Sequence, residues 1–276
     1  MEDLDPHTSN LRHEQSQLDD LAALGIDWDE VPVRQSERFD AYGDAIADLT
    51  RSGLLYPCYC TRREIAEAVT APNSPTPTDG YPGTCRELSR SELDRRVAES
   101  RPAALRLRAD AVEIDFIDEL RGETTGRVDD VVVQRNDGVA SYNLAVVVDD
   151  AAQGVDLVVR GDDLLESTPR QIHLGELLGL PRPRYAHVPL VLGIGPDGTP
   201  RRLAKRDGAV TLSDRRRLGD TPGAVVSALA GSLGLDPLNG DPLAAAYVDR
   251  FGASLLSSEP LVLSAGRLAL PLPWPT

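Results

Sequence analysis

The chain has 276 residues, of which 41% are hydrophobic and 26% are charged, proportions typical of a globular protein with one large domain or one domain carrying an insertion. It shows no apolar run long enough to cross a bilayer and no signal-peptide pattern, so we expect a cytoplasmic protein with no membrane partner. The net charge of −15 excludes indiscriminate binding of nucleic acid, because the phosphate backbone repels an acidic surface, and leaves only a local basic strip for such contacts.

Two helices are predicted in the N-terminal part of the chain. Residues 10–24 and 37–53 place apolar side chains at helical spacing, and a glycine stops each run. Residues 1–5 are typical of the end of a strand, and the carboxylate of Glu2 is a candidate for binding an amino group; the alternative is a solvated acidic terminus. Met1 is either the true start or a start placed inside a longer coding sequence.

The cysteines are a candidate metal site. Cys58, Cys60 and Cys85 are the only three in the chain, and a cytoplasmic protein does not normally keep disulfides. Zinc prefers four ligands, usually thiolates and imidazoles, and Tyr81 is spaced to supply the fourth as a phenolate. The alternatives are water or a distant histidine as the fourth ligand, or three buried cysteines without metal. The histidines do not cluster at metal spacing, and we expect ordinary surface or core roles for His7, His13, His173 and His187.

Strand-like runs dominate the middle of the chain. Short β runs are predicted at 101–109, 112–120 and 129–135, the last followed by a hairpin-type turn at 136–138. The apolar runs 143–150 and 155–163, each ending in acids, are typical of buried strands in a parallel sheet, where ligands collect beyond the carboxyl ends. A helix then follows, for which we expect Thr168 as the cap and Pro169 in the first turn.

Tyr142 and Arg160 stand near opposite ends of these two consecutive predicted strands. An arginine at the end of a buried strand costs desolvation energy unless it is paired. A carboxylate ligand held by both nitrogens of the guanidinium is one natural partner. The alternative is an internal ion pair with Asp149, Asp162 or Asp163.

Lys205 is the only lysine among the 29 cationic residues. It lies in the loop 201–208, after a strand predicted at 188–193, and helices are predicted further on at 222–234 and 241–256. An ammonium on a flexible stem can offset the charge that develops on a polyphosphate; the alternative is a surface lysine. The densest cationic stretch surrounds it and is either a grip on nucleic acid or a solvated face, formed by Arg201, Arg202, Arg206, Arg215, Arg216 and Arg217.

Residues 142–193, followed by RRLAKRDGAVTL at 201–212, resemble the second half of the catalytic domain of glutamyl-type class I aminoacyl-tRNA synthetases. RLAKR is similar to the KMSKS loop of that family in a degenerate form, and MEDLDP at 1–6 is similar to a strand end. The resemblance extends to about residue 215. It implies an α/β fold, a Rossmann-type catalytic domain interrupted by a small zinc-binding subdomain.

About 70 residues follow Lys205, too few for the anticodon-binding region of a complete glutamyl-tRNA synthetase. The length resembles the truncated paralogous family, the glutamyl-queuosine tRNA(Asp) synthetases. That resemblance implies activation of glutamate by ATP with Mg²⁺, transfer to queuosine in tRNA(Asp), and one structural Zn²⁺; we also expect a monomer. The alternatives are a fragment that charges tRNA(Glu), or a synthetase-like binding protein without activity.

The resemblance also implies roles for single residues. Glu2 would contact the α-amino group of glutamate, Tyr142 would complete the pocket, and Arg160 would clamp a carboxylate. Lys205 would bind ATP and stabilise the departing pyrophosphate. The zinc ligands would be Cys58, Cys60, Tyr81 and Cys85.

Four segments are expected on the same grounds. Residues 1–53 would be the remainder of the first half of the nucleotide-binding fold, and residues 54–130 the zinc-bearing insertion. Residues 131–215 would be the second half of the catalytic fold with the KMSKS-like loop, and residues 216–276 a C-terminal helical segment with a tail. The family's HIGH motif has no counterpart in the chain, so we expect that a segment before Met1 is absent, through a misplaced start or a true loss. Ala204 and Arg206 replace the two serines of the KMSKS loop.

Overall fold

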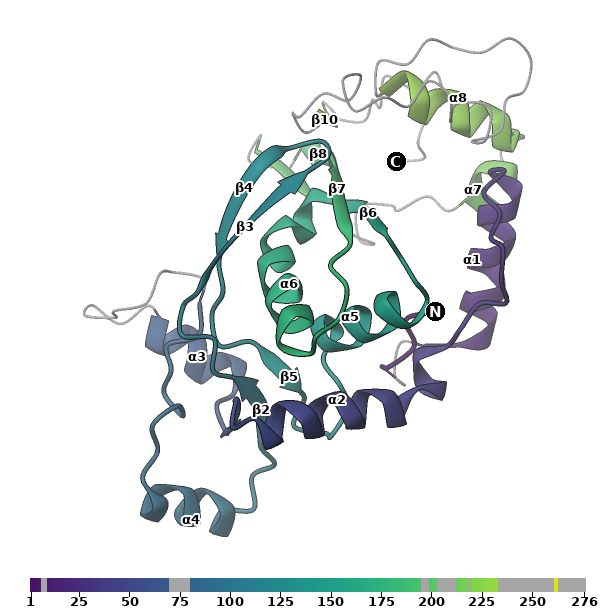
Figure 1. The fold of residues 1–276 in the computed structure, drawn as a ribbon. Coiled ribbons are helices and arrows are strands. Elements are labelled where there is room, and N and C mark those ends of the chain that lie inside the picture. Colours follow the sequence, from purple (N-terminus) through teal and green to yellow (C-terminus); the bar gives the residue numbers. More distant parts are fainter. Residues whose placement is uncertain are drawn as a thin grey trace.

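The structure is a computed structural model, shown in Figure 1. It describes residues 1–5, 9–69, 80–194, 199–202, 212–217, 219–232 and 261–262. Several predictions from the sequence lie outside these residues: the loop residue Lys205, the helix at 241–256, and the C-terminal tail.

The two predicted N-terminal helices are confirmed. Helix α1 (Leu11–Ala23) begins after Asn10, whose side chain accepts a hydrogen bond from a backbone N–H of the first turn. Helix α2 (Phe39–Arg51) presents one apolar face to the core. The first five residues are not a strand; instead the Met1 ammonium donates to the carbonyl of Val33, and the carbonyl of Met1 accepts from the Gln35 N–H.

A small antiparallel sheet carries the cysteine segment. Its strands lie in the order β1 (Leu55–Cys58), β2 (Ala104–Leu107) and β5 (Val132–Gln134). Between β1 and β2 the chain forms helices α3 (Arg62–Val69) and α4 (Arg90–Ala98). The predicted turn after β5 is confirmed, and Gly138 adopts a φ of +86° there, which a residue with a side chain rarely does.

The larger sheet has the order β4-β3-β7-β6 and mixes directions. Strands β3 (Glu113–Asp118) and β4 (Gly122–Arg127) form a hairpin, and β6 (Leu157–Gly161) and β7 (Arg184–Val188) run parallel to each other and to β3. A Cβ at Gly126 would lie 2.3 Å from Cγ of Pro169, so only glycine lets helix α6 (Thr168–Leu177) approach β4 this closely. The predicted α/β class is confirmed.

The strand predicted at 143–150 is wrong: Tyr142–Ala152 form helix α5. Three consecutive valines favour a strand by propensity, but the Ser141 hydroxyl accepts from the Leu144 N–H and caps a helix. Buried Ala145 and Asp149, four residues apart, then lie on one face of that helix. Tertiary packing therefore decides against the local propensity. Thr168 is also not the cap of the next helix but its first residue, after Ser167.

The remaining elements are short. Two 3-10 helices span Gln35–Glu37 and Asp162–Ser167. The strand predicted at 188–193 is divided between the end of β7 and the start of β8 (Val191–Ile194), which pairs with β9 (Pro200–Arg202) and β10 (Leu261–Val262). Helices α7 and α8 span Leu212–Arg217 and Pro222–Ser232. Within the described residues, no helix has the length and apolar character needed to span a bilayer.

The expected segment boundaries stay a prediction. Strands β3 and β4 belong to the expected zinc-bearing segment 54–130, and β3 pairs with β7 of the next segment. The same sheet thus contains strands from both segments.

A buried carboxylate holds helix α5 against helix α2. Asp149 accepts from the Tyr42 hydroxyl at 2.8 Å, from Nε of Arg38 at 2.6 Å and from the Gln35 amide at 3.0 Å. Its side chain is 8% exposed, so these three donors replace almost all of the water that an ionised carboxylate requires. The contact fixes the position of α5 in the core.

We predict that Asp149→Asn lowers the free energy of unfolding by about 2 to 4 kcal/mol, because Arg38 loses its charged partner in a poorly solvated position. Asp48→Asn, which breaks the exposed ion pair with Arg51, should cost less than about 0.5 kcal/mol. Urea denaturation of both variants measures the difference, and equal effects would contradict the role given to Asp149.

Candidate active site

Arg160 lies near the carboxyl end of β6, beside the parallel strand β7 and close to the point where β3 ends (Figure 1). Asp118 ends β3, and His187 of β7 is the register partner of Arg160. Ligand sites of α/β sheets form at this edge, because the connections there diverge and leave space. Helices α5 and α6, which contact one another, contribute side chains to the same place.

Neutral groups hold the Arg160 guanidinium. Its Nε donates to Nε2 of His187 at 3.1 Å, its Nη1 to Oε1 of Gln171 at 2.7 Å, and its Nη2 to the Thr168 hydroxyl at 2.8 Å. A longer contact joins Nη2 to the carbonyl of Leu164. These acceptors orient the guanidinium without cancelling its charge, so a carboxylate ligand can still be attracted.

Two of the three acids considered as ion-pair partners of Arg160 pair with other arginines. Asp149 pairs with Arg38 instead, and Asp162 pairs with Arg121. The reason is the helix at 142–152, which directs Asp149 toward α2.

Glu2 and Tyr142 lie within range of the Arg160 charge. Burial has the largest effect on the pKa of Glu2 and raises it, while the Met1 ammonium and, to a smaller extent, the charge of Arg160 act in the opposite direction. Burial and the negative charge of Glu2 raise the pKa of the Tyr142 phenol, again opposed by Arg160. Tyr142 is the first residue of α5 and not a strand end as predicted. The charge of Arg160 thus acts on both of the other predicted residues, Glu2 and Tyr142.

Asp150 is a further acid in this region that the sequence did not single out. Burial, followed by repulsion from Asp149 and Glu2, raises its pKa to about 6, although Arg160 lowers it. Its side chain also lines a cavity of about 20 Å³ together with Gln171 of α6. The sequence shows Asp149 and Asp150 at the end of the run 143–150. That run was predicted as a strand, which would have placed both acids at the end of a sheet strand and not on a helix.

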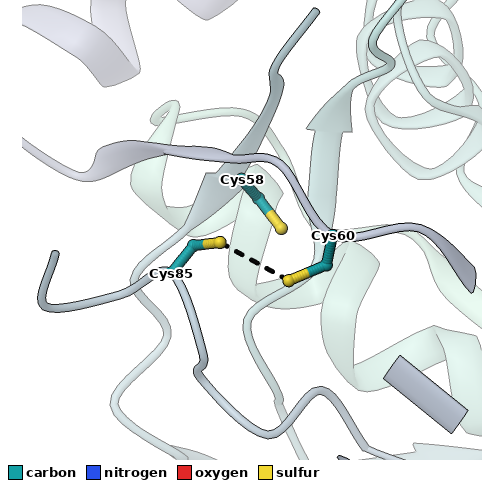
Figure 2. Close-up of side chains that lie close together, drawn as sticks. All are labelled: Cys58, Cys60 and Cys85. Atoms are coloured by element: carbon teal, nitrogen blue, oxygen red, sulfur yellow. Dashed lines mark hydrogen bonds between the residues drawn. The ribbon is translucent and has the colours of Figure 1, made fainter. Parts of the chain in front are cut away.

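The three cysteines lie together, as Figure 2 shows, at the end of β1 and in the loop that precedes α4. Their sulfur atoms are all within 4.8 Å of one another, and those of Cys60 and Cys85 are 3.4 Å apart. The Tyr81 hydroxyl lies 3.3 Å from Sγ of Cys58 and 3.6 Å from Sγ of Cys60. Four ligands around Zn²⁺ stand about 3.8 Å apart in a tetrahedron, so the four side chains could hold such an ion.

Within this cluster, Cys58 is the thiol whose ionised form the hydrogen bonds favour. Hydrogen bonds from the Cys60 and Cys85 thiols lower the pKa of Cys58, against the effect of burial. The buried guanidinium of Arg106 lies over the Tyr81 ring, 3.7 Å from its centroid. Burial and the hydrogen bonds with Cys58 and Cys60 raise the pKa of the Tyr81 phenol, so a metal ion bound there would have to displace its proton.

Asp129 links the cysteine segment to helix α6. It accepts from the backbone N–H of Tyr81 at 3.2 Å and from Nε of Arg170 at 2.6 Å. Arg170 directly precedes Gln171, which holds Arg160. A polar cleft of about 600 Å³ lies beside this link and is lined by charges of both signs, including Arg86, Arg127 and Glu166.

Two predictions concern the C-terminal part of the chain. Lys205 lies outside the described residues, so its role stays a prediction. Arg215, predicted within the basic strip, is 4% exposed and forms an ion pair with Asp220, whereas Arg216 and Arg217 are exposed. Arg215 therefore cannot offer its charge to a nucleic acid at the surface.

The fold and the charged edge of the sheet agree with a family model. Residues 1–241 match the model described as tRNA synthetases class I (E and Q), catalytic domain. The match covers most of the chain, and the chain belongs to this family. The resemblance predicted from RLAKR and the residues before it is confirmed.

The curated relatives narrow the comparison. A protein of Nocardia farcinica named glutamyl-Q tRNA(Asp) synthetase is 54% identical over 95% of the chain and 81% of its own length. A protein of Symbiobacterium thermophilum with the same name is 42% identical over 98% of the chain and 86% of its own length. A third, from Cutibacterium acnes, is 51% identical, and the match spans 62% of its length.

Solved structures show the same fold. A glutamate tRNA ligase from Elizabethkingia meningosepticum superposes with a TM-score of 0.75 over 96% of the chain, at 23% identity. A glutamate-tRNA synthetase from Elizabethkingia anophelis superposes with a TM-score of 0.76, also at 23% identity. The chain spans 60% of the length of each of these structures.

We predict that Asp150→Asn raises the thermal unfolding temperature at about pH 7.5 and leaves it unchanged below about pH 4. The pKa of about 6 in the folded state exceeds the ordinary value of 3.8, so the folded protein binds the proton more tightly and loses stability as pH rises through that interval. The amide removes this loss. Differential scanning calorimetry at both pH values is the measurement; exposed Asp44, changed to Asn, is the control. A gain of equal size at both pH values would contradict the assignment.

Proposed function

We propose that this chain activates glutamate with ATP and transfers it to queuosine in tRNA(Asp). The observation that carries the proposal is the Arg160 guanidinium, held by neutral groups and flanked by acids. A free amino acid is a zwitterion, so a site for it needs a cation for a carboxylate and an acid for the ammonium. Arg160 and Glu2 supply this pair, and the names of the relatives specify glutamate and queuosine.

The proposed reaction has two steps. A carboxylate oxygen of glutamate attacks the α-phosphorus of Mg²⁺-bound ATP, the bond to the β-phosphate oxygen breaks, and pyrophosphate leaves. A queuosine hydroxyl then attacks the carbonyl carbon of the adenylate, AMP leaves, and the hydroxyl proton passes to solvent. Arg160 clamps a glutamate carboxylate and Tyr142 closes the pocket beside it, while Lys205 offsets the charge of the departing pyrophosphate. Such substrates place the protein in the cytoplasm, and it needs no partner subunit in this scheme.

The cysteine cluster is proposed to bind one structural Zn²⁺. Cys58, Cys60, Cys85 and Tyr81 would supply three thiolates and a phenolate, which leave no open position for a substrate. The ion would join the end of β1 to the loop before α4. Through Asp129 it would also support α6, on which Gln171 and Thr168 orient Arg160.

The first test is exchange of labelled pyrophosphate into ATP by the full-length protein. We expect exchange that depends on glutamate and needs no tRNA, followed by transfer of labelled glutamate to tRNA(Asp) that contains queuosine. Arg160→Gln should lower kcat/KM for glutamate by about 100- to 1,000-fold, the usual loss for one preorganised charged donor. Arg184→Gln, a matched change in the neighbouring strand at an exposed position, should have little effect.

Two outcomes would overturn the proposed function. Transfer to tRNA(Glu), and not to queuosine-containing tRNA(Asp), would assign the chain to ordinary glutamyl-tRNA synthesis. Binding of glutamate without any exchange would instead indicate a binding protein. The relatives' shared name disfavours the first of these.

We predict about one zinc ion per purified chain, measured by elemental analysis. Its removal by a chelator should lower the unfolding temperature by about 10 °C, because a tightly bound ligand stabilises only the folded state. Tyr81→Phe should release zinc at a lower chelator concentration than the wild type. Tyr59→Phe is the control, since Tyr59 is buried beside the cluster. Equal release from both variants would exclude Tyr81 as a ligand, and metal-free protein with unchanged stability would exclude the site.

A further inference from the structure

Asp118 and His187 form a buried polar pair that the proposed reaction does not use. Both side chains are 0% exposed, and Nδ1 of His187 lies 2.6 Å from Oδ2 of Asp118. The other carboxylate oxygen accepts from the backbone N–H groups of Leu120, Arg121 and His187 itself. Burial alone would raise the pKa of Asp118, but these hydrogen bonds lower it. Asp118 is therefore an ionised acceptor.

The hydrogen bonds around the His187 ring determine its tautomer. Because an ionised Asp118 can only accept, Nδ1 of His187 must carry a proton. Burial and the charge of Arg160 lower the pKa of His187, although the Asp118 carboxylate opposes this. The ring is then neutral, and Nε2 offers a lone pair to Nε of Arg160, 3.1 Å away.

The side chains of Gln171 and Thr168, which also accept hydrogen bonds from Arg160, are oriented in a similar way. The Gln171 amide donates to Oδ1 of Asn143 at 3.1 Å, which directs its carbonyl oxygen to Nη1 of Arg160. The Thr168 hydroxyl lies 3.1 Å from Nε2 of His187 and accepts from Nη2. A neighbouring side chain therefore orients each of these groups so that it presents an acceptor to Arg160.

We propose that His187, held by Asp118 with its proton on Nδ1, is a positioning residue that sets the orientation of Arg160 for a substrate carboxylate. The inference rests on the proposed function, since glutamate is the ligand concerned. If an acidic residue stood in place of His187, its carboxylate would cancel the charge of Arg160. A protonated imidazole, or the other tautomer, would turn an N–H toward the guanidinium and displace it.

Substitutions that replace only one of the two imidazole nitrogens by an amide group separate this role from a purely structural one. His187→Asn keeps a donor for Asp118 but offers no acceptor to Arg160, whereas His187→Gln places an acceptor near Nε2. We expect His187→Asn to weaken glutamate binding by about 10- to 100-fold, the loss of one hydrogen bond to a charged group. His187→Gln should stay within about threefold of the wild type. If the pair only stabilises the sheet, the order is reversed.

Asp118→Asn tests the tautomer independently. Its amide nitrogen donates to Nδ1, so the proton moves to Nε2 and faces the Arg160 donor. We expect a loss of glutamate affinity as large as that of His187→Asn. Asp115→Asn is the matched control, because Asp115 lies on the same strand at an exposed position.

Glutamate affinity is measured by titration calorimetry on the full-length variants, after circular dichroism has shown that each is folded. The exchange assay adds a second criterion: KM for glutamate should rise while KM for ATP stays unchanged. If the wild type does not bind glutamate, the proposed function falls and this inference with it. If the wild type binds glutamate and Asp118→Asn binds equally well, or the Asn and Gln variants show the reverse order, only the inference is overturned. Should His187→Asn fail to fold, the Asp118→Asn result decides.

Discussion

A cation held by neutral acceptors is the constraint on which the candidate site depends. Arg160 contacts an imidazole, an amide and a hydroxyl through its three nitrogens. Partial removal of a guanidinium from water is unfavourable unless its donors are satisfied, and these groups satisfy them while leaving the positive charge uncancelled. The same charge lowers the pKa values of Glu2 and Asp150, against the effect of burial.

The rest of the fold serves to place these groups. The parallel strands β3, β6 and β7 bring Asp118, Arg160 and His187 to one edge of the sheet. Helix α5 is held against α2 by Asp149, and α6 approaches β4 closely over Gly126. The cysteine segment reaches the same helix through Asp129 and Arg170, which ties the proposed metal site to the packing around Arg160.

Much of the secondary structure was predictable because its signals are local. Helices α1 and α2 follow from apolar spacing and terminal glycines, and β3 follows from a short β-type run, although Ile117 is exposed and Asp118 is buried at its end. Helix α5 was wrongly predicted as a strand because its three consecutive valines favour strands. The signal for a helix is a single capping residue, Ser141, which is weaker than the valine run. Of the candidate site, the cysteines, Tyr81 and Arg160 were found from their residue types, whereas His187 was expected to be unremarkable chemically.

By itself, the sequence determined the family, the α/β class, and which residue types are available for charge and metal chemistry, because motifs and periodicity are properties of neighbouring residues. Only the tertiary structure decided which of these residues meet. Asp118 and His187 are separated by 69 positions and Asp149 lies 107 positions from Tyr42, and no local pattern encodes such pairs. Their partners are chosen by sheet order and helix packing, which also determine that Arg160 is held by an imidazole and not neutralised by an acid.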